Sequence, residues 1–328
     1  MINPQAPDWR PSRREVISIG LGMFVVAIPL ARWATRPRLV RRTLPVMGTM
    51  AEIAVVGRDE PAAHAAIDAA FERLSWVERV MTRFDPSSDV GRANIGAARE
   101  PVAIHAETAA VLTSALQWAE LSGGRFDPCL GKAVQLWDVS GRTSPPAGTE
   151  TVRFAGRGLH EQLELGSWRG SDIVRFHAND LAIDLGGIAK GRAVDMAVQA
   201  LREHGVTDGF VSAGGDLYAL GNSDDGGPWQ TGVRSPSDPR SIVSTIGVSD
   251  RAIATSGDYE AYYDYRGRRY HHLLDPETGE PRRTDLHTVT VAADDCMTAD
   301  AAATACFGLT PEDARRVLGR RAIIVHMA

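Results

Sequence analysis

The sequence predicts an α+β fold in which helices pack against mostly antiparallel sheet. Apolar residues recur at helical spacing in residues 61–83 and 107–121, whereas residues 209–292 contain short apolar strands separated by polar turns. Short turns join antiparallel neighbours, because a parallel crossover needs a dozen or more residues. Helices grouped before and after a run of strands are typical of an α+β fold rather than of a doubly wound sheet.

Local signals place the individual elements. The first helix begins near Pro61, and the second ends before Gly123-Gly124, a common helix stop. A strand at 181–185 is expected to lead into a helix at 188–203. Seven further strands are expected at residues 209–211, 217–220, 229–234, 242–248, 259–265, 269–274 and 288–292. Two helices, 297–307 and 311–318, then precede a final strand at 322–326.

Composition places the chain among ordinary globular proteins. It has 328 residues, 44% hydrophobic and 23% charged, enough for one large or two modest domains. The formal net charge of -5 and the lack of a basic block argue against nucleic acid as the main partner. The three cysteines, Cys129, Cys296 and Cys306, lack the C-x-x-C spacing of zinc and redox sites, so we interpret them as buried hydrophobes.

The N-terminus resembles a twin-arginine export signal. Arg13-Arg14 precedes an uncharged run at residues 19–31, and this arrangement predicts a periplasmic protein. The alternative is an uncleaved inner-membrane anchor facing the periplasm, although the run is short for a full span. We therefore expect an export signal or anchor with a linker at residues 1–42 and one folded domain at 43–328. A candidate internal seam lies in the Gly- and Pro-rich segment 140–170.

The segment AIDLGGIAKGRAVD, residues 182–195, places Asp184, two glycines and Lys190 at one strand-to-helix corner. Glycines let the backbone approach a ligand closely, and helix amides together with a lysine suit an anion such as phosphate. The corner is not a P-loop, because Gly191 follows the lysine, and it lacks the G-x-G-x-x-G pattern. On spacing alone, a phosphate-binding corner and a tight turn capping a core helix remain equally open.

Two further segments carry polar side chains suited to chemistry. Asp300 and Thr304 share one helical face, so their oxygens form a candidate half-site for Mg²⁺. The alternative is an acidic residue that favours the helix dipole beside an incidental threonine. His271 and His272 are adjacent on an expected strand and point to opposite faces, so only one can face a given cleft. A surface histidine is the default interpretation.

Taken in order, these segments resemble the FAD:protein FMN transferase family, also called ApbE. The matching motifs are M-G-T at 47–49, the loop TRFDPSSDVGRAN at 82–94, G-R-F-D-P at 124–128, D-L-G-G-I-A-K-G at 184–191, G-G-D at 214–216, T-S-G at 255–257, H-L-L-D-P-E-T-G at 272–279 and D-A-A-A-T at 300–304. The resemblance implies an ApbE-type, T-fold-like α+β architecture. The chain departs from the common pattern at Cys129, where threonine is frequent.

The resemblance implies an enzyme that transfers FMN from FAD to a Thr or Ser hydroxyl of a target flavoprotein and releases AMP. Mg²⁺ would be bound by the Gly187 carbonyl, Asp300 and Thr304. His272 and Asp300 are the implied catalytic residues, His272 by assisting proton transfer or by holding the pyrophosphate. The implied FAD contacts are Met47, Phe84, Arg125, Phe126, Asp127, Asp184, Lys190, His272 and Leu274.

The acceptor flavoprotein is a separate question. The arginine pair, with no lipoprotein cysteine after it, resembles the exported NosX branch, which serves the membrane flavoprotein NosR of nitrous-oxide respiration. Two other functions fit the same motifs: an FAD pyrophosphatase that gives FMN and AMP, and a non-enzymatic periplasmic FAD-binding protein. Contact with the membrane is expected only through the N-terminal segment.

Overall fold

The computed structural model describes residues 24–27, 38–57, 59–156, 158–235 and 241–328. The predicted signal therefore lies largely outside the described residues; residues 24–27 form the short strand β1 (Phe24–Ala27). Within the described part of the chain, no helix is both long enough and apolar enough to cross a membrane.

The chain folds into two compact units, each assembled from three segments. Unit 1 takes the chain up to Trp76, residues 190–255 and residues 291–300. Unit 2 takes residues 77–189, residues 256–290 and residues 301–328. The Gly- and Pro-rich segment 140–170 lies wholly within unit 2.

Unit 1 is built on an antiparallel sheet in the order β11-β8-β7-β3-β2, and residues 291–293 of β16 lie beside β11. A smaller sheet has the order β1-β9-β10. The strands are β2 (Arg38–Val46), β3 (Thr49–Gly57), β7 (Gly209–Ala213), β8 (Asp216–Leu220), β9 (Trp229–Arg234), β10 (Ile242–Val248), β11 (Arg251–Gly257) and β16 (Thr288–Ala293).

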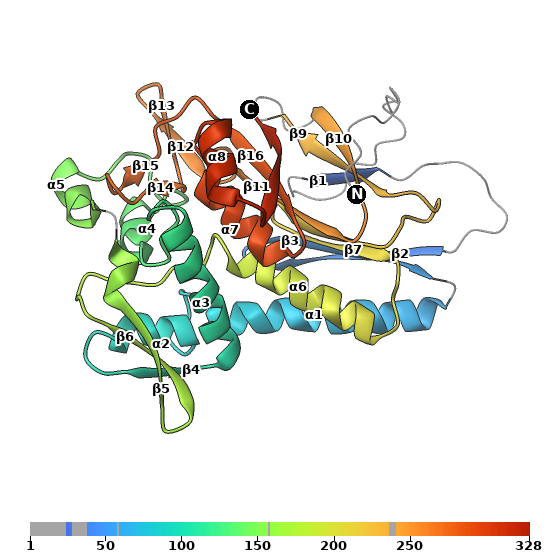
Figure 1. The fold of residues 1–328 in the computed structure, drawn as a ribbon, viewed down its shortest axis with the longest axis horizontal. Helices are drawn as coiled ribbons and strands as arrows, with labels where there is room; N and C mark the ends of the chain where they lie inside the picture. The colour runs from blue at the N-terminus through green and yellow to red at the C-terminus, as the bar shows by residue number, and fades with distance from the viewer. Residues whose placement is uncertain (1–23, 28–37, 58, 157, 236–240) are drawn as a thin grey trace. The chain divides into compact units, whose positions relative to one another are not determined.

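Two helices run along the large sheet of unit 1, namely α1 (Glu60–Met81) and α6 (Ala189–Glu203), as Figure 1 shows. Arg73 of α1 and Glu203 of α6 form an ion pair at 3.8 Å. The core of the unit includes Phe210 and Trp229, whose rings pack edge to face with centroids 5.1 Å apart. Trp229 is buried, and its indole N–H donates to the carbonyl of Leu220, so its polar atom is satisfied.

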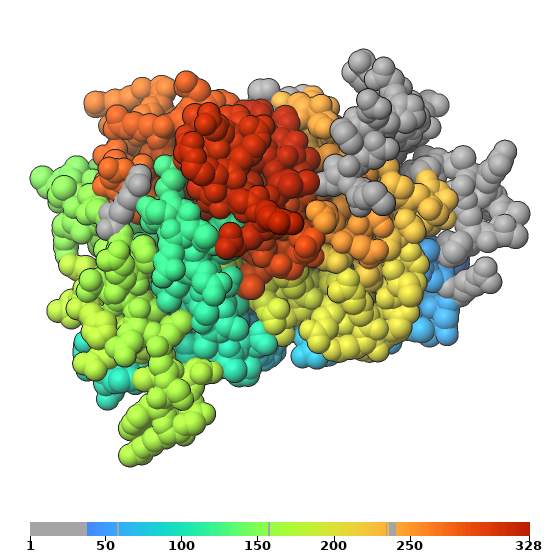
Figure 2. Space-filling view, viewed as in Figure 1, coloured from blue at the N-terminus to red at the C-terminus, as the bar shows by residue number. Residues whose placement is uncertain are grey.

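Unit 2 combines helices with three small sheets. The order β4-β6-β5 forms one sheet, and β12-β13 and β14-β15 form hairpins. The yellow-green projection at the lower left of Figure 2 is the hairpin of β5 and β6. The elements are α2 (Asp89–Gly96), β4 (Val102–Ile104), α3 (Ala106–Leu121), α4 (Gly131–Trp137), α5 (Gly148–Thr151), the 3₁₀ turns η1 (Val152–Phe154) and η2 (Leu159–Gln162), β5 (Leu163–Trp168), β6 (Ser171–Phe176), β12 (Tyr262–Tyr265), β13 (Arg268–His271), β14 (Leu274–Asp275) and β15 (Glu280–Pro281).

The C-terminal part of the chain completes the fold with α7 (Cys296–Cys306), α8 (Pro311–Leu318) and β17 (Ala322–Met327). In unit 2, the Ala328 amide donates to the carbonyl of Thr288, which ties the chain end to the start of β16. The predicted α+β class with mostly antiparallel sheet is confirmed, and all five predicted helices are present. Their ends differ from the expected ones by at most two residues, as is usual at fraying termini.

Two local expectations were wrong. Residues 181–185 do not form a strand, apart from one isolated bridge between Leu130 and Ala182. The backbone of Ile183 is bonded instead by a side chain, because Asn94 both donates to its carbonyl and accepts from its amide. Residues 251–257, where no strand was expected, form strand β11.

Candidate active site

In unit 1, two buried carboxylates hold the lysine of the predicted phosphate corner. Lys190 Nζ lies 3.1 Å from Asp216 Oδ2 and 3.2 Å from both carboxylate oxygens of Asp300. The side chains of Asp216 and Asp300 are only 2% and 4% exposed. The ammonium of Lys190 therefore lies against two buried carboxylates, and a charged group buried in this way needs an oppositely charged partner.

The glycine after this lysine has a packing role. The Gly191 amide donates to Asp300 Oδ2 at 3.1 Å. A Cβ at Gly191 would lie 2.3 Å from the carbonyl oxygen of Cys296, so only glycine lets α6 approach the start of α7 this closely. The sequence K-G at this corner thus positions Asp300 and Lys190 together.

In unit 2, Gly187 and Thr304 lie close together. A Cβ on Gly187 would lie 2.9 Å from Thr304 Oγ1 and 3.3 Å from a ring carbon of Phe126. Ser256 Oγ, from the T-S-G motif, lies 3.3 Å from the same threonine hydroxyl. Asp300 lies one turn before Thr304 on α7. The carboxylate, the hydroxyl and the nearby glycine backbone are hard oxygen donors of the kind that Mg²⁺ prefers.

The donors available for a metal are thus mostly not acidic side chains. Across the part of the chain that the structure describes, no three His, Cys, Asp or Glu side chains converge as a metal-binding group. Hydroxyl and carbonyl oxygens beside a single carboxylate leave coordination positions for phosphate or water, as Mg²⁺ sites commonly do.

Asp184, the carboxylate of the corner, has its own partner. Its Oδ2 lies 2.8 Å from Arg83 Nε, and its Oδ1 accepts the Gly186 amide at 2.8 Å. The Arg83 guanidinium also stacks on the ring of Phe84, 4.2 Å from its centroid. Phe84 is 79% exposed, which is unusual for a large aromatic side chain. Arg83 therefore neutralises Asp184 beside an aromatic face that is open to solvent.

The R-F-D segment, residues 125–127, forms hydrogen bonds with other parts of unit 2. Arg125 donates to the carbonyl of Phe307 at 2.9 Å. Asp127 is buried, and its oxygens accept the amides of Cys129 and His160 and meet His160 Nδ1 at 3.0 Å. This hydrogen bond to Asp127 raises the pKa of His160. The predicted FAD contacts of Arg125, Phe126 and Asp127 stay predictions.

The two adjacent histidines have different environments. His271 is buried; its Nε2 lies 3.0 Å from the carbonyl of Arg282, its Nδ1 accepts the Leu273 amide, and burial lowers its pKa to about 4. His272 is partly exposed, and its Nδ1 lies 3.3 Å from the carbonyl of Ala261. A carbonyl can only accept, so Nδ1 of the neutral ring is the donor and Nε2 is the nitrogen that carries the lone pair. His272 is thus the better suited of the two to proton transfer.

The remaining predicted contacts lie at a turn and in the core. Met47 adopts φ 54° beside Gly48 at φ 69°, in the two-residue turn between β2 and β3. A bulky residue in the left-handed region is strained, and such strain concentrates at ligand sites. Leu274 is buried in an apolar cluster with Trp137 and Phe154, so its side chain belongs to the core.

Sequence reasoning left out three residues that the structure places in these clusters. Asp216 lies in the G-G-D motif, so a signal for it existed. Arg83 lies in the loop at 82–94, but nothing in that motif singled it out. Arg282 carries no local signal, because its partners Arg125 and Thr304 are far from it in sequence.

The sequence matches a known protein family over most of its length. The family model described as the ApbE family matches residues 47–326. A protein of Treponema pallidum named FAD:protein FMN transferase is 35% identical over 294 residues, covering 84% of this chain and 80% of that protein. A Vibrio cholerae protein of the same name is 34% identical over 266 residues, covering 79% and 78%.

Solved structures give the same result. The ApbE protein of Thermotoga maritima aligns with a TM-score of 0.78 at 31% identity, over 89% of this chain and 96% of that one. The flavin transferase ApbE of Vibrio cholerae aligns with a TM-score of 0.75 at 30% identity, over 86% and 90%. From the extent of the family match and the identity to these relatives, the chain belongs to the ApbE family.

Proposed function

We propose that this protein is an FAD:protein FMN transferase that attaches FMN to a threonine or serine of an acceptor flavoprotein. Its family relatives carry that name. The observation that carries the proposal is that Lys190 lies against the buried carboxylates of Asp216 and Asp300. Asp300 lies on α7, the helix that also carries Thr304. Enzymes of phosphoryl transfer commonly use a lysine that binds phosphate together with a metal ion held by oxygen ligands.

The reaction balances as a displacement at phosphorus. The acceptor hydroxyl oxygen forms a bond to the FMN-side phosphorus of FAD, and the bond from that phosphorus to the bridging oxygen breaks. AMP leaves with that oxygen, and the hydroxyl proton passes to a base. Positioning and charge neutralisation carry most of the catalysis in such reactions.

Mg²⁺ fits the donors at α7, and Asp300, Thr304 and the Gly187 carbonyl would hold it. Its contribution when bound is to neutralise charge on the phosphates. Lys190, held by Asp216, supplies a second positive charge for the pyrophosphate. His272 is the candidate base; it is partly exposed, and its Nε2 lies 3.9 Å from a carboxylate oxygen of Glu260. The exposed ring of Phe84 offers a face on which a flavin or adenine ring can stack.

The test is a mass spectrum of an acceptor after incubation with this protein, FAD and Mg²⁺. The proposed acceptor is a membrane flavoprotein such as NosR, tested as its soluble flavin-binding domain. We expect a mass increase of one FMN on a single threonine, lost when Mg²⁺ is chelated and reduced at least about a hundredfold in rate in Asp300→Asn.

The same experiment separates the competing functions. Release of AMP and free FMN without an acceptor would favour an FAD pyrophosphatase, which uses water in place of the hydroxyl. Intact FAD bound tightly, with no adduct on any acceptor tried, would favour a flavin-binding protein that is not an enzyme.

We also propose that the protein works in the periplasm, delivered by the arginine-pair segment. Support comes from the sequence Arg13-Arg14 followed by an apolar run. Replacing both arginines by lysine should trap the full chain in the cytoplasm, as cell fractionation would show. Unchanged periplasmic recovery would exclude the twin-arginine route.

A further inference from the structure

Arg282 is a buried arginine whose side chain donates to four backbone carbonyls. Its Nε donates to Leu274 at 3.1 Å, and its Nη2 donates to Arg125 at 2.6 Å. Its Nη1 donates to Thr304 at 2.7 Å and to Phe307 at 2.9 Å. The residue is 6% exposed. A charged group this deeply buried is costly unless its donors are satisfied, and four hydrogen bonds provide that.

These carbonyls come from three segments that each carry a candidate site residue. Thr304 is a predicted metal ligand and lies in the last turn of α7. The Arg125 carbonyl immediately precedes Phe126, whose ring lies near Gly187. Leu274 follows His272 in the H-L-L-D-P motif. A single guanidinium therefore ties together three segments far apart in the chain.

The end of α7 explains why a cation belongs there. The last four carbonyls of an α-helix have no partner within the helix, and the C-terminal end of the helix dipole is negative. Arg282 satisfies the Thr304 carbonyl and the Phe307 carbonyl just beyond the helix. A planar guanidinium spreads its donors over several directions, which a lysine ammonium on a flexible stem does not match.

The backbone of Arg282 is fixed as firmly as its side chain. Its amide donates to the carbonyl of Leu273 at 3.0 Å. Its carbonyl lies 3.0 Å from Nε2 of His271, the buried neutral histidine. The position of the guanidinium is therefore set by the strand segment that also carries the two histidines.

We propose that Arg282 is a positioning residue for FMN transfer: it sets the place of Thr304 relative to the segments of His272 and Phe126 and touches no substrate. This inference rests on the proposed transferase function. Small displacements of positioned groups cost up to about a hundredfold in rate, so loss of this residue should lower activity far more than stability alone explains.

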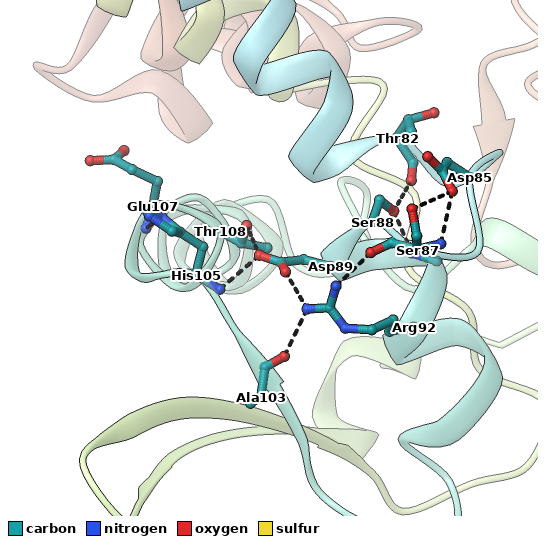
Figure 3. A network of polar contacts seen from close by, with 11 residues as sticks. Thr82, Asp85, Ser87, Ser88, Asp89, Arg92, Ala103, His105, Glu107 and Thr108 are labelled. Carbon is teal, nitrogen blue, oxygen red and sulfur yellow. Dashed lines mark hydrogen bonds and ion pairs between the residues drawn. The ribbon is translucent and has the colours of Figure 1, made fainter.

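The experiment compares Arg282→Lys and Arg282→Met with wild type and with the control Asp89→Asn. Asp89 is the centre of another buried polar network in unit 2, shown in Figure 3. It accepts the His105 amide at 2.7 Å and the Thr108 hydroxyl at 2.6 Å and pairs with Arg92. The control therefore breaks a comparable set of buried polar contacts, in which none of Asp89's direct partners is a candidate site residue.

Three readouts are needed: melting temperature, FAD affinity from flavin fluorescence without turnover, and the rate of FMN transfer over a range of Mg²⁺ concentrations. In Arg282→Lys we expect a transfer rate lower by tenfold to about a hundredfold and a raised Mg²⁺ requirement. The control should lose melting temperature but keep FAD affinity, the transfer rate and the Mg²⁺ requirement.

The inference is overturned if Arg282→Lys matches the control, with lower melting temperature and unchanged rate, FAD affinity and Mg²⁺ requirement. If Arg282→Met does not fold, Arg282→Lys alone decides the question. Failure of the transferase proposal is distinguishable, because then wild type itself would form no adduct, while FAD binding by the variants would still report on the site segments.

Discussion

At the scale of single residues, Lys190 is the group on which the charge balance of unit 1 depends. It is the cation between Asp216 and Asp300, both almost fully buried. Removing one partner of a buried ion pair leaves uncompensated charge, which is far more destabilising than the pair itself is stabilising.

We therefore expect Lys190→Met to lower the free energy of unfolding by about 3–5 kcal/mol at pH 7. The loss should shrink when Asp216→Asn is added, and millimolar Mg²⁺ should recover part of it. Urea unfolding with and without Mg²⁺ measures both effects. Full stability in the single variant would mean that the two carboxylates are not charged together.

Lys190, Asp300 and Thr304 could be identified from the sequence, because each lies in a short motif whose residue types and spacing suggest binding of phosphate or a metal ion. Arg83 and Arg282 were out of reach, because their roles depend on partners such as Asp184 and Thr304 that only the fold brings near. Residue type and spacing alone did not separate His271 from His272, and only the family resemblance pointed to His272. The fold separates them by burial, which suppresses protonation of His271.

At the scale of elements, α7 depends on how its first turn is held. Asp195 of α6 accepts the amides of Cys296 and Met297 at 2.7 and 2.9 Å. Burial raises the pKa of Asp195 to about 7, assisted by the nearby charge of Asp295 and opposed by these two amides and by Arg192. The folded state therefore holds a proton on this carboxyl that the unfolded chain releases near pH 4.

The raised pKa of Asp195 predicts that the stability of the protein depends on pH. Between pH 4 and 7 the folded state binds more protons at Asp195 than the unfolded state, so this residue's contribution to stability falls as pH rises through that range. The change amounts to about 2–4 kcal/mol. Urea unfolding at pH 5 and 8 should show that Asp195→Asn flattens this part of the profile. An identical slope in wild type and variant would contradict the assignment.

The close contact of α6 with α7 gives a second prediction at this scale. Gly191→Ala places a Cβ against the backbone of Cys296, which cannot move cheaply. We expect a loss of about 1–3 kcal/mol or more and a lower transfer rate. Gly57→Ala is the matched control, because nothing lies within 4 Å of a Cβ there. Equal stability of the two variants in thermal unfolding would show that the helices separate readily.

Helices were predictable as elements because their apolar periodicity is local. Strand β11 was not predicted, because Ser256 and Gly257 suggest a loop, although both are buried. The strand expected at 181–185 was wrong because the Asn94 side chain supplies the hydrogen bonds that a neighbouring strand would. When a side chain replaces a neighbouring strand as hydrogen-bond partner, the sequence shows no periodic pattern that would reveal it.

At the scale of the whole molecule, all three cysteines are buried thiols, as predicted. Burial raises the pKa of Cys306 to about 12 and those of Cys129 and Cys296 well above the usual value. The thiolate is the reactive form, so native thiols should be inert. We expect no reaction with Ellman's reagent in native buffer and three equivalents in urea. Rapid labelling of the native protein would contradict this burial.

The interleaving of the two units bears on how the protein is made. Unit 1 needs residues 291–300 and unit 2 needs residues 301–328, so neither has all its parts until almost the entire chain has left the ribosome. Domains usually fold in order from the N-terminus during synthesis. Here that order is unavailable, so nascent chains should depend on chaperones until translation ends, and premature termination should leave no folded product.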